Sequence, residues 1–404
     1  MTTAAGGQDE GPSPKILPID EDWMRELLLR LLVTPSPTGR TDQIMQFLGE
    51  TLNDLGIPFE LTRRGALLAT LRGRRRAPAR AIVVHSDTIG ITVKRLKPNG
   101  RLQAVPIGTH SARFSEGARV TIFTDDPAVT WSGTVLPLKS SGHAYGDEVD
   151  TQGVGWDHVE IRVDEPVHDA ADLAGLGIQV GDFVAHHALP EITRSGYVKS
   201  RHLDDKAGLA AAIAAFKAVQ ETGLELPVTS HLLVTIAEEV GHGASHGLHA
   251  DVAEMVSIDS AVVAPVQEGT ETGVTVAMQD MTGPFDFHLT RRLLALCAEH
   301  GIEHRRDVFQ NYRSDVAAAL EAGAEMRAAL IGFGTDATHG HERTTMNAIR
   351  NIAELTTVYL QSELTFAEWD AHRRGDLADF PGDDQPAAQQ PTVSAEPDPA
   401  EPDT

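Results

Sequence analysis

Residues 232–242 read LLVTIAEEVGH, an apolar run followed by two adjacent glutamates and a glycine turn. The run at 232–237 contains Val and Ile and predicts a buried strand. Glu238 and Glu239 follow it directly, and open α/β sheets bind their ligands at the carboxyl ends of strands. Two buried carboxylates repel each other unless a cation or a shared proton compensates. The stretch predicts a metal ion that holds one glutamate while the other moves protons; the alternative is a solvated pair.

The same pattern recurs in four other segments, which favours the metal site over the solvated pair. Each segment joins a predicted strand end or helix start to His, Asp or Glu side chains. The groups are His85 and Asp87 after residues 81–84, Asp259 after residues 255–258, Asp204 and Asp205 at the start of an Ala-rich helical segment, and His339, His341 and Glu342 after residues 330–333. Five such element ends in one α/β pattern predict a shared site.

Composition limits the chemistry and the partners. The chain has 404 residues, which predicts two or three domains. Its formal net charge of −24 argues against nucleic acid and against anionic membrane surfaces as partners. Cys297 is the single cysteine, so an intrachain disulfide and a cysteine zinc site are both excluded. A bound metal would therefore use histidine and carboxylate ligands.

The two ends of the chain predict disorder. Residues 1–18 are small and polar and lack the apolar core of a signal peptide. Residues 369–404 form an acidic, Pro-rich and Gln-rich tail with too little apolar surface to fold alone. No stretch approaches the roughly 20 apolar residues of a membrane span. We expect a cytoplasmic protein with no membrane contact.

The predicted secondary structure changes in the middle of the chain. Residues 91–195 contain short segments in which apolar and polar residues alternate, separated by turns. Pro98-Asn99-Gly100 is a hairpin signal between two of them. Residues 19–90 and 196–368 show strands alternating with helices. The sequence therefore predicts an α/β fold, with a mixed sheet flanked by helices and a β-rich domain inserted at residues 91–195.

These motifs resemble the glutamyl and deblocking aminopeptidase family of dinuclear zinc metallopeptidases, which includes the tetrahedral aminopeptidases. The likeness covers roughly residues 21–366, and its motifs are HSDTIG at 85–90, LDDKAG at 203–208, EEVG at 238–241 and SDV at 314–316. The chain departs from the family in Lys206, where an arginine is usual. It is similar, more narrowly, to a branch found with synthesis of an acetylated glutaminylglutamine amide osmoprotectant.

The resemblance implies a zinc-exopeptidase-like fold and assigns roles residue by residue. Two divalent ions are expected, with zinc as the default and cobalt or manganese as substitutes. The implied ligands are His85, Asp204 and Asp259 for one ion, and Asp204, Glu239 and His341 for the other. Glu238 would be the general base, and Asp87 would hydrogen-bond His85 and fix its tautomer.

The last histidine ligand lies in a segment that departs from the family pattern. The family usually has Arg-Tyr-x-His-Ser at this point, whereas residues 338–343 read THGHER. We prefer His341 to His339 because the closing helix is predicted to begin soon after it. His202 and His242 flank the predicted site and are interpreted as bystanders.

The expected function is dinuclear metal-dependent hydrolysis of the N-terminal peptide bond of small peptides. Two cations about 3.5–4 Å apart can activate a shared water and polarise a carbonyl group. The inserted β-rich domain would drive assembly into a homo-oligomer, as the resemblance implies. Two alternatives are an N-acyl-dipeptide deacylase that uses the same metals, and a non-catalytic assembly protein.

Overall fold

The computed structural model describes residues 13–372, 377, 380 and 382. Its contacts divide the chain into residues 1–365 and residues 366–404. In the described part of the first unit, a mixed sheet of 12 strands runs in the order β1-β2-β12-β3-β13-β17-β18-β11-β10, with β14 beside β17 and with β15 and β16 beside β14. The outer strands are β1 (Phe59–Leu61), β2 (Leu67–Leu71), β10 (Glu191–Ile192), β11 (Tyr197–Ser200), β14 (Val274–Asp280), β15 (Gly283–Pro284), β16 (His304–Val308) and β18 (Glu342–Thr345).

Four parallel strands form the centre of this sheet. They are β12 (Leu226–Thr235), β3 (Gly73–His85), β13 (Val252–Val263) and β17 (Arg327–Asp336). Each residue of β12 is buried, as expected for a parallel strand covered on both faces. Because the strands are parallel, their carboxyl ends meet at one edge of the sheet, and the α/β fold with a mixed sheet is confirmed.

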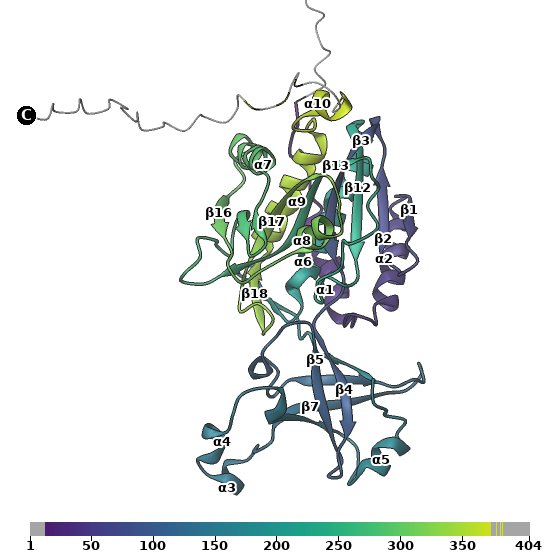
Figure 1. Ribbon diagram of the computed structural model, residues 1–404, viewed down its shortest axis with the longest axis vertical. Coiled ribbons are helices and arrows are strands. Elements are labelled where there is room, and N and C mark those ends of the chain that lie inside the picture. The colour runs from purple at the N-terminus through teal and green to yellow at the C-terminus, as the bar shows by residue number, and fades with distance from the viewer. Residues whose placement is uncertain (1–12, 373–376, 378–379, 381, 383–404) are drawn as a thin grey trace, which may run out of the picture. The chain divides into compact units, whose positions relative to one another are not determined.

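Helices cover the central strands (Figure 1). The long helices α6 (Leu203–Thr222) and α9 (Met346–Gln361) pack against each other and against the sheet, and α1 (Glu21–Val33) packs on α6. The Asp20 carboxylate caps α1 by accepting the Trp23 N–H at 3.1 Å, as its sequence predicts. The remaining α-helices of the sheet region are α2 (Asp42–Asp54), α7 (Phe287–Glu299) and α8 (Asp315–Glu321).

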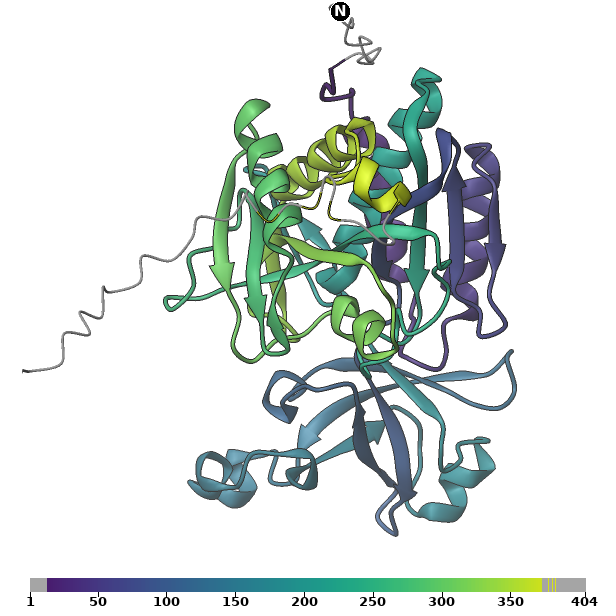
Figure 2. The same cartoon turned by 45° about the horizontal axis from the view of Figure 1, so that its top comes forward.

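Between β3 and β11 the chain forms a closed β-barrel, drawn in blue and teal in Figures 1 and 2. Its own apolar core is separate from that of the sheet. The strands are β4 (Gly90–Leu96), β5 (Arg101–Ile107), β6 (Arg119–Phe123), β7 (Thr130–Pro137), β8 (Val159–Val163) and β9 (Phe183–His186), and its short helices are η1 (Ala112–Phe114), α3 (Gly142–Tyr145), α4 (Glu148–Thr151), η2 (Trp156–His158) and α5 (Ala170–Gly175). The strands lie in the segment predicted to be β-rich, and β4 pairs with β5 across the predicted hairpin turn.

The chain ends differ from the sequence expectation where they are described. Leu17 is buried and its N–H donates to the Thr357 hydroxyl at 3.3 Å. Lys15 and Leu17 therefore contact α9, although disorder was predicted for residues 1–18. Residues 369–372 belong to a short helix, α10 (Ala367–His372), and most of the predicted disordered tail lies outside the described residues. None of the described helices combines the length and hydropathy needed to cross a bilayer.

A buried arginine ties α9 to the strand that carries His85. Arg80 is fully buried in β3; its guanidinium lies 4.3 Å from the centre of the Tyr359 ring. It donates to the Tyr359 carbonyl and, at 2.8 Å, to the Ser362 carbonyl. Both carbonyls lie at the carboxyl end of α9, where helix carbonyls lack helical partners.

We expect Arg80→Ala to lower the free energy of unfolding by about 3 kcal/mol, because it empties a buried space and leaves the Ser362 carbonyl without its donor. Chemical denaturation of the purified variant measures this. The control is Arg305→Ala on the exposed side of β16, which should change stability by less than about 0.5 kcal/mol. Equal stability of the Arg80 and Arg305 variants would contradict the anchoring role.

Candidate metal centre

The sheet edge at the carboxyl ends of the parallel strands gathers the predicted site residues. His85 is the last residue of β3, and Glu238 and Glu239 lie just beyond the end of β12. Asp259 lies inside β13, which extends four residues further than Asp259. Asp204 lies in the first turn of α6, where its backbone is not yet helical.

Three of these side chains form one buried group. His85 Nε2 lies 3.0 Å from Asp204 Oδ1 and 3.9 Å from Asp259 Oδ1. Ligand atoms of the three residues lie within 4.8 Å of one another, and each residue is buried. Atoms about 2.1 Å from a tetrahedral zinc ion are about 3.4 Å from each other. The spacing and the imidazole–carboxylate chemistry therefore fit a divalent metal ion.

Asp204 faces a second group with its other oxygen. His339 Nε2 lies 3.4 Å from Asp204 Oδ2 and 3.4 Å from Glu239 Oε2. Both distances exceed the usual 2.7–3.2 Å of an N–H···O hydrogen bond, yet the atoms converge as ligands of one ion do. The two oxygens of Asp204 thus point to two different histidines, which is the arrangement of a bridging carboxylate.

The structure brings His339 to this group instead of His341. The His341 side chain is largely exposed. Its partial burial, followed by the positive charges of Arg201 and Lys199, lowers its pKa. His339 lies in the turn before β18, with a φ of +63°. The strand β18, which the sequence did not predict, begins at Glu342 and buries that side chain, whereas the neighbouring His341 stays exposed. The closing helix begins at Met346, soon after His341 as predicted, but its start does not decide which histidine faces the centre.

Asp87 positions the site by a different contact from the predicted one. His85 Nδ1 hydrogen-bonds the backbone carbonyl of Asp87 at 2.9 Å, whereas the carboxylate is 3.7 Å away. The Asp87 carboxylate accepts the N–H groups of Glu238 and Glu239 at 3.1 and 3.3 Å, and the Thr38 hydroxyl at 2.6 Å. The residue therefore orients the imidazole through its backbone and the two glutamates through its side chain.

Glu342 is a site residue to which sequence reasoning gave no role. Its buried carboxylate accepts the Asp204 N–H at 3.1 Å and the His339 N–H at 2.8 Å. Burial and the Asp204 charge raise the pKa of Glu342 to about 8, against the opposing effect of His339. An acid beside the two histidines was the available signal, but its role depends on the unpredicted strand β18.

Asp315 supports the turn that follows the two glutamates. It accepts the Thr235 hydroxyl at 2.6 Å and the Ala244 N–H at 2.7 Å. Burial raises its pKa to about 6. A Cβ on Gly243 would lie 2.3 Å from an Asp315 oxygen, so only glycine fits this turn.

The inserted barrel also contacts the site. His339 Nδ1 hydrogen-bonds the Thr109 carbonyl, just after β5, at 2.8 Å. Arg201 donates to the Phe114 carbonyl of the barrel at 2.7 Å and to the Gly340 carbonyl at 3.4 Å. The loop that carries His339 is therefore held from the barrel side as well as by Glu342.

Uncompensated negative charge dominates the electrostatics of the centre. Burial raises the pKa of both Glu238 and Asp259 well above the usual range, and it raises the pKa of Glu239 to about 7. Burial alone would lower the pKa of His339, but the charges of Glu239 and Asp204 raise it to about 11. A group of acids that resists ionisation, beside imidazoles that attract protons, is a site whose charge a bound cation would balance.

The two adjacent glutamates differ in exposure. The Glu239 side chain is 3% exposed, faces His339 and accepts the Ile89 N–H at 3.0 Å. The Glu238 side chain is 12% exposed and lies 3.9 Å from His85 Nε2. Glu238 is thus the more accessible of the pair.

The two flanking histidines do not join the centre. His202 hydrogen-bonds the His186 carbonyl at 3.4 Å, and the His242 ring contacts exposed Arg64 at 3.1 Å.

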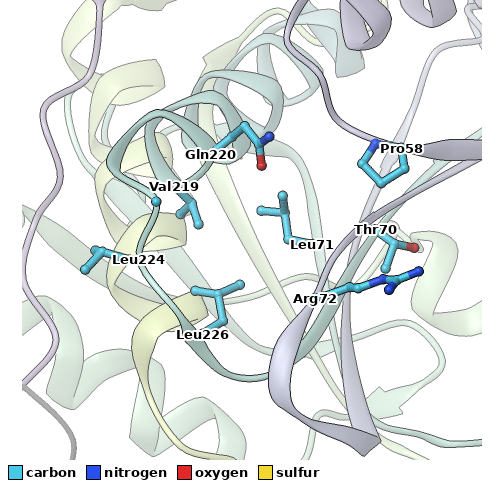
Figure 3. Close-up of a pocket in the computed structure, with 9 residues that line it drawn as sticks. Pro58, Thr70, Leu71, Arg72, Val219, Gln220, Leu224 and Leu226 are labelled. Carbon is cyan, nitrogen blue, oxygen red and sulfur yellow. The ribbon is translucent and has the colours of Figure 1, made fainter.

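A cavity of about 350 Å³ lies away from the centre, between β2 and the carboxyl end of α6 (Figure 3). Leu226, at the start of β12, lines it, so it lies at the opposite end of that strand from Glu238.

Comparison with known proteins identifies relatives over most of the chain. The sequence profile of the M42 glutamyl aminopeptidase family matches residues 65–355. The YhfE protein of Bacillus subtilis is 35% identical over 339 residues, which is 84% of this chain and 97% of that protein.

Solved structures share the fold. A TET aminopeptidase from a marine sediment archaeon of the Thaumarchaeota aligns with a TM-score of 0.77 at 17% identity, over 84% of this chain and 96% of that one. A Pyrococcus horikoshii TET1 peptidase, which can assemble into a tetrahedron or a large octahedral shell, aligns with a TM-score of 0.73 at 20% identity, over 84% and 100%.

The two histidines of the 338–343 segment make a matched pair for a metal-binding test. We expect His339→Ala to bind less divalent metal than the unaltered protein, because the variant loses the imidazole that faces Asp204 and Glu239. His341→Ala should keep its full metal content, because that side chain is exposed. Elemental analysis after dialysis against metal-free buffer measures both, and the reverse order would restore His341 as the ligand.

Proposed function

The chain belongs to the M42 glutamyl aminopeptidase family, and we propose that it is a two-metal aminopeptidase that removes the N-terminal residue from small peptides. Family membership makes the chain a peptidase and a hydrolase. The observation that carries the two-metal proposal is Asp204, whose two oxygens face His85 and His339 on separate sides. A one-metal site would need only one of these groups.

Each ion would have its own ligand set around the shared Asp204. His85, Asp204 and Asp259 would hold one ion, and Asp204, Glu239 and His339 the other. Zinc suits imidazole and carboxylate ligands at these spacings, and cobalt or manganese would accept the same set. His339 replaces His341 in this proposal because of its distances to Asp204 and Glu239.

Glu238 would carry the proton in the reaction. Bound divalent ions supply positive charge that acidifies a water and polarises a carbonyl group. Glu238 would take a proton from the attacking water as the water oxygen bonds to the carbonyl carbon. It would then pass that proton to the amine nitrogen as the carbon–nitrogen bond breaks. Its greater exposure than that of Glu239 supports this role over a ligand role.

Asp87 and Glu342 would be positioning residues. Asp87 fixes the backbone of both glutamates, and Glu342 fixes the backbone of Asp204 and His339. Residues of this kind around metal ligands maintain the geometry that binding requires.

The barrel supports a proposal of self-assembly. Pyrococcus horikoshii TET1, whose fold this chain shares, forms closed shells. We infer a homo-oligomer built through the inserted barrel, as the sequence resemblance implies. The cytoplasmic location and the osmoprotectant branch stay predictions from the sequence.

A panel of dipeptides with free and acylated N-termini tests the activity. The proposed aminopeptidase should hydrolyse free dipeptides and leave the acylated ones intact, and a chelator should abolish turnover. Hydrolysis of the acylated dipeptides alone would establish the deacylase alternative. Failure to hydrolyse any member in the presence of added zinc, cobalt or manganese would support a non-catalytic assembly protein.

Substitutions of the adjacent glutamates test their separate roles. We expect Glu238→Gln to keep its metal and to lower kcat by about 10²–10⁴-fold, because the amide cannot accept the proton. We expect Glu239→Gln to lose metal, and added metal should partly restore its activity. The measurement is kcat beside metal content for both variants. Metal loss in the Glu238 variant with full metal in the Glu239 variant would reverse the two roles.

A further inference from the structure

Tyr312 lies beside the metal centre without a role in the proposal above. It belongs to the loop between β16 and α8, three residues before Asp315. Its carbonyl accepts the Met281 N–H at 3.0 Å, and its ring centre lies 5.1 Å from that of Phe309. The backbone contact and the ring contact hold the side chain in place.

The hydroxyl of Tyr312 is buried, and it faces the carboxylates of the centre. It is directed at Asp259, yet it makes no hydrogen bond of normal geometry with any described residue. A buried polar group without a partner is rare in folded proteins and calls for an explanation. A tyrosine hydroxyl has an ordinary pKa of about 10, so it keeps its proton at neutral pH and can donate a hydrogen bond.

A cavity adjoins Tyr312. Tyr312 also lines a cavity of about 630 Å³ together with Val262, Met278 and Phe309. Val262 is near the end of β13, three residues beyond Asp259, so this cavity lies on the side of the sheet edge where the centre is. The ring therefore stands between an open space and the carboxylates.

The centre otherwise presents acceptors to a substrate. Around Tyr312 the nearby charged groups are Asp259, Asp204 and Glu238, and each of them disfavours negative charge on a reacting oxygen. Hydrolysis of an amide places negative charge on the carbonyl oxygen in the transition state, and preorganised donors stabilise that charge. A neutral hydrogen-bond donor that points into these carboxylates could stabilise the negative carbonyl oxygen of the transition state.

We propose that the Tyr312 hydroxyl donates a hydrogen bond to the carbonyl oxygen of the scissile bond as that oxygen becomes negative. The inference rests on the proposed peptidase function. As water adds to the carbonyl carbon, the electron pair of the carbon–oxygen double bond moves to the oxygen, and Tyr312 donates to it. The pair returns as the carbon–nitrogen bond breaks, and Glu238 delivers the proton to the amine. Tyr312 keeps its own proton throughout.

The test variant is Tyr312→Phe, which removes the hydroxyl and keeps the ring against Phe309. We expect kcat to fall by about 10²–10³-fold, the usual effect of losing one oxyanion donor, with little change in KM. The metal content should stay equal to that of the unaltered protein. The affinity for a phosphinic dipeptide analogue, which mimics the tetrahedral state, should fall by a similar factor, whereas the affinity for the free amino-acid product should not change.

The control is Tyr359→Phe, which removes another buried tyrosine hydroxyl far along the sheet. That hydroxyl donates to Glu254 at 2.8 Å and lies near Arg80, so its loss should lower stability and leave kcat and analogue binding unchanged. Metal loss in Tyr312→Phe would show that Tyr312 acts by positioning Asp259, and would overturn the proposal.

The outcomes also separate this inference from the proposed function. If the unaltered protein hydrolyses peptides and Tyr312→Phe matches its kcat, the role of Tyr312 is refuted and the peptidase proposal stands. If the unaltered protein, loaded with metal, hydrolyses no peptide of the panel, both proposals are refuted together.

Discussion

Repulsion among buried carboxylates at one edge of the sheet is the constraint on which the site depends. Glu238, Glu239, Asp204 and Asp259 converge there because two parallel strands and one helix start deliver them to the same place. Their mutual charge would oppose folding if every group were ionised. His85 and His339, which contact these carboxylates, offset only part of it. Divalent cations would balance the rest, which couples metal binding to the stability of the native sheet edge.

The sequence predicted the parts of the site that depend on strand ends. An apolar run followed by a polar group indicates the end of a buried parallel strand, and an Ala-rich pattern indicates a helix start. These two patterns were enough to predict four of the residues that lie together: His85, Asp204, Glu239 and Asp259. The hairpin signal at residues 98–100 likewise marked the pairing of β4 with β5. These features are local, so the order of residues along the chain is enough to reveal them.

The parts that escaped prediction depend on distant pairing. The choice of His341 rested on a helix that begins soon after it. That helix does begin at Met346, but pairing with β11 and β17 makes the preceding residues 342–345 a strand. That pairing buries Glu342, while the turn before β18 directs His339 to the centre and leaves His341 exposed. No periodicity in so short a segment reports this. The same holds for Tyr312, since its hydroxyl reaches Asp259 from a loop with no strand or helix pattern. Leu17 also shows that contacts with a distant helix can order a polar stretch.

The hydrogen bond from His339 to the Thr109 carbonyl has a thermodynamic consequence. It joins a side chain at the sheet edge to a loop of the inserted barrel. The orientation of the imidazole and the position of that loop are therefore energetically coupled. Linkage of this kind is reciprocal: whatever stabilises one arrangement of the loop changes the affinity of the imidazole for its ligand by the same factor, and loading the imidazole shifts the loop in return. The barrel therefore contributes to the binding energy of the centre, even though none of the proposed ligands belongs to it.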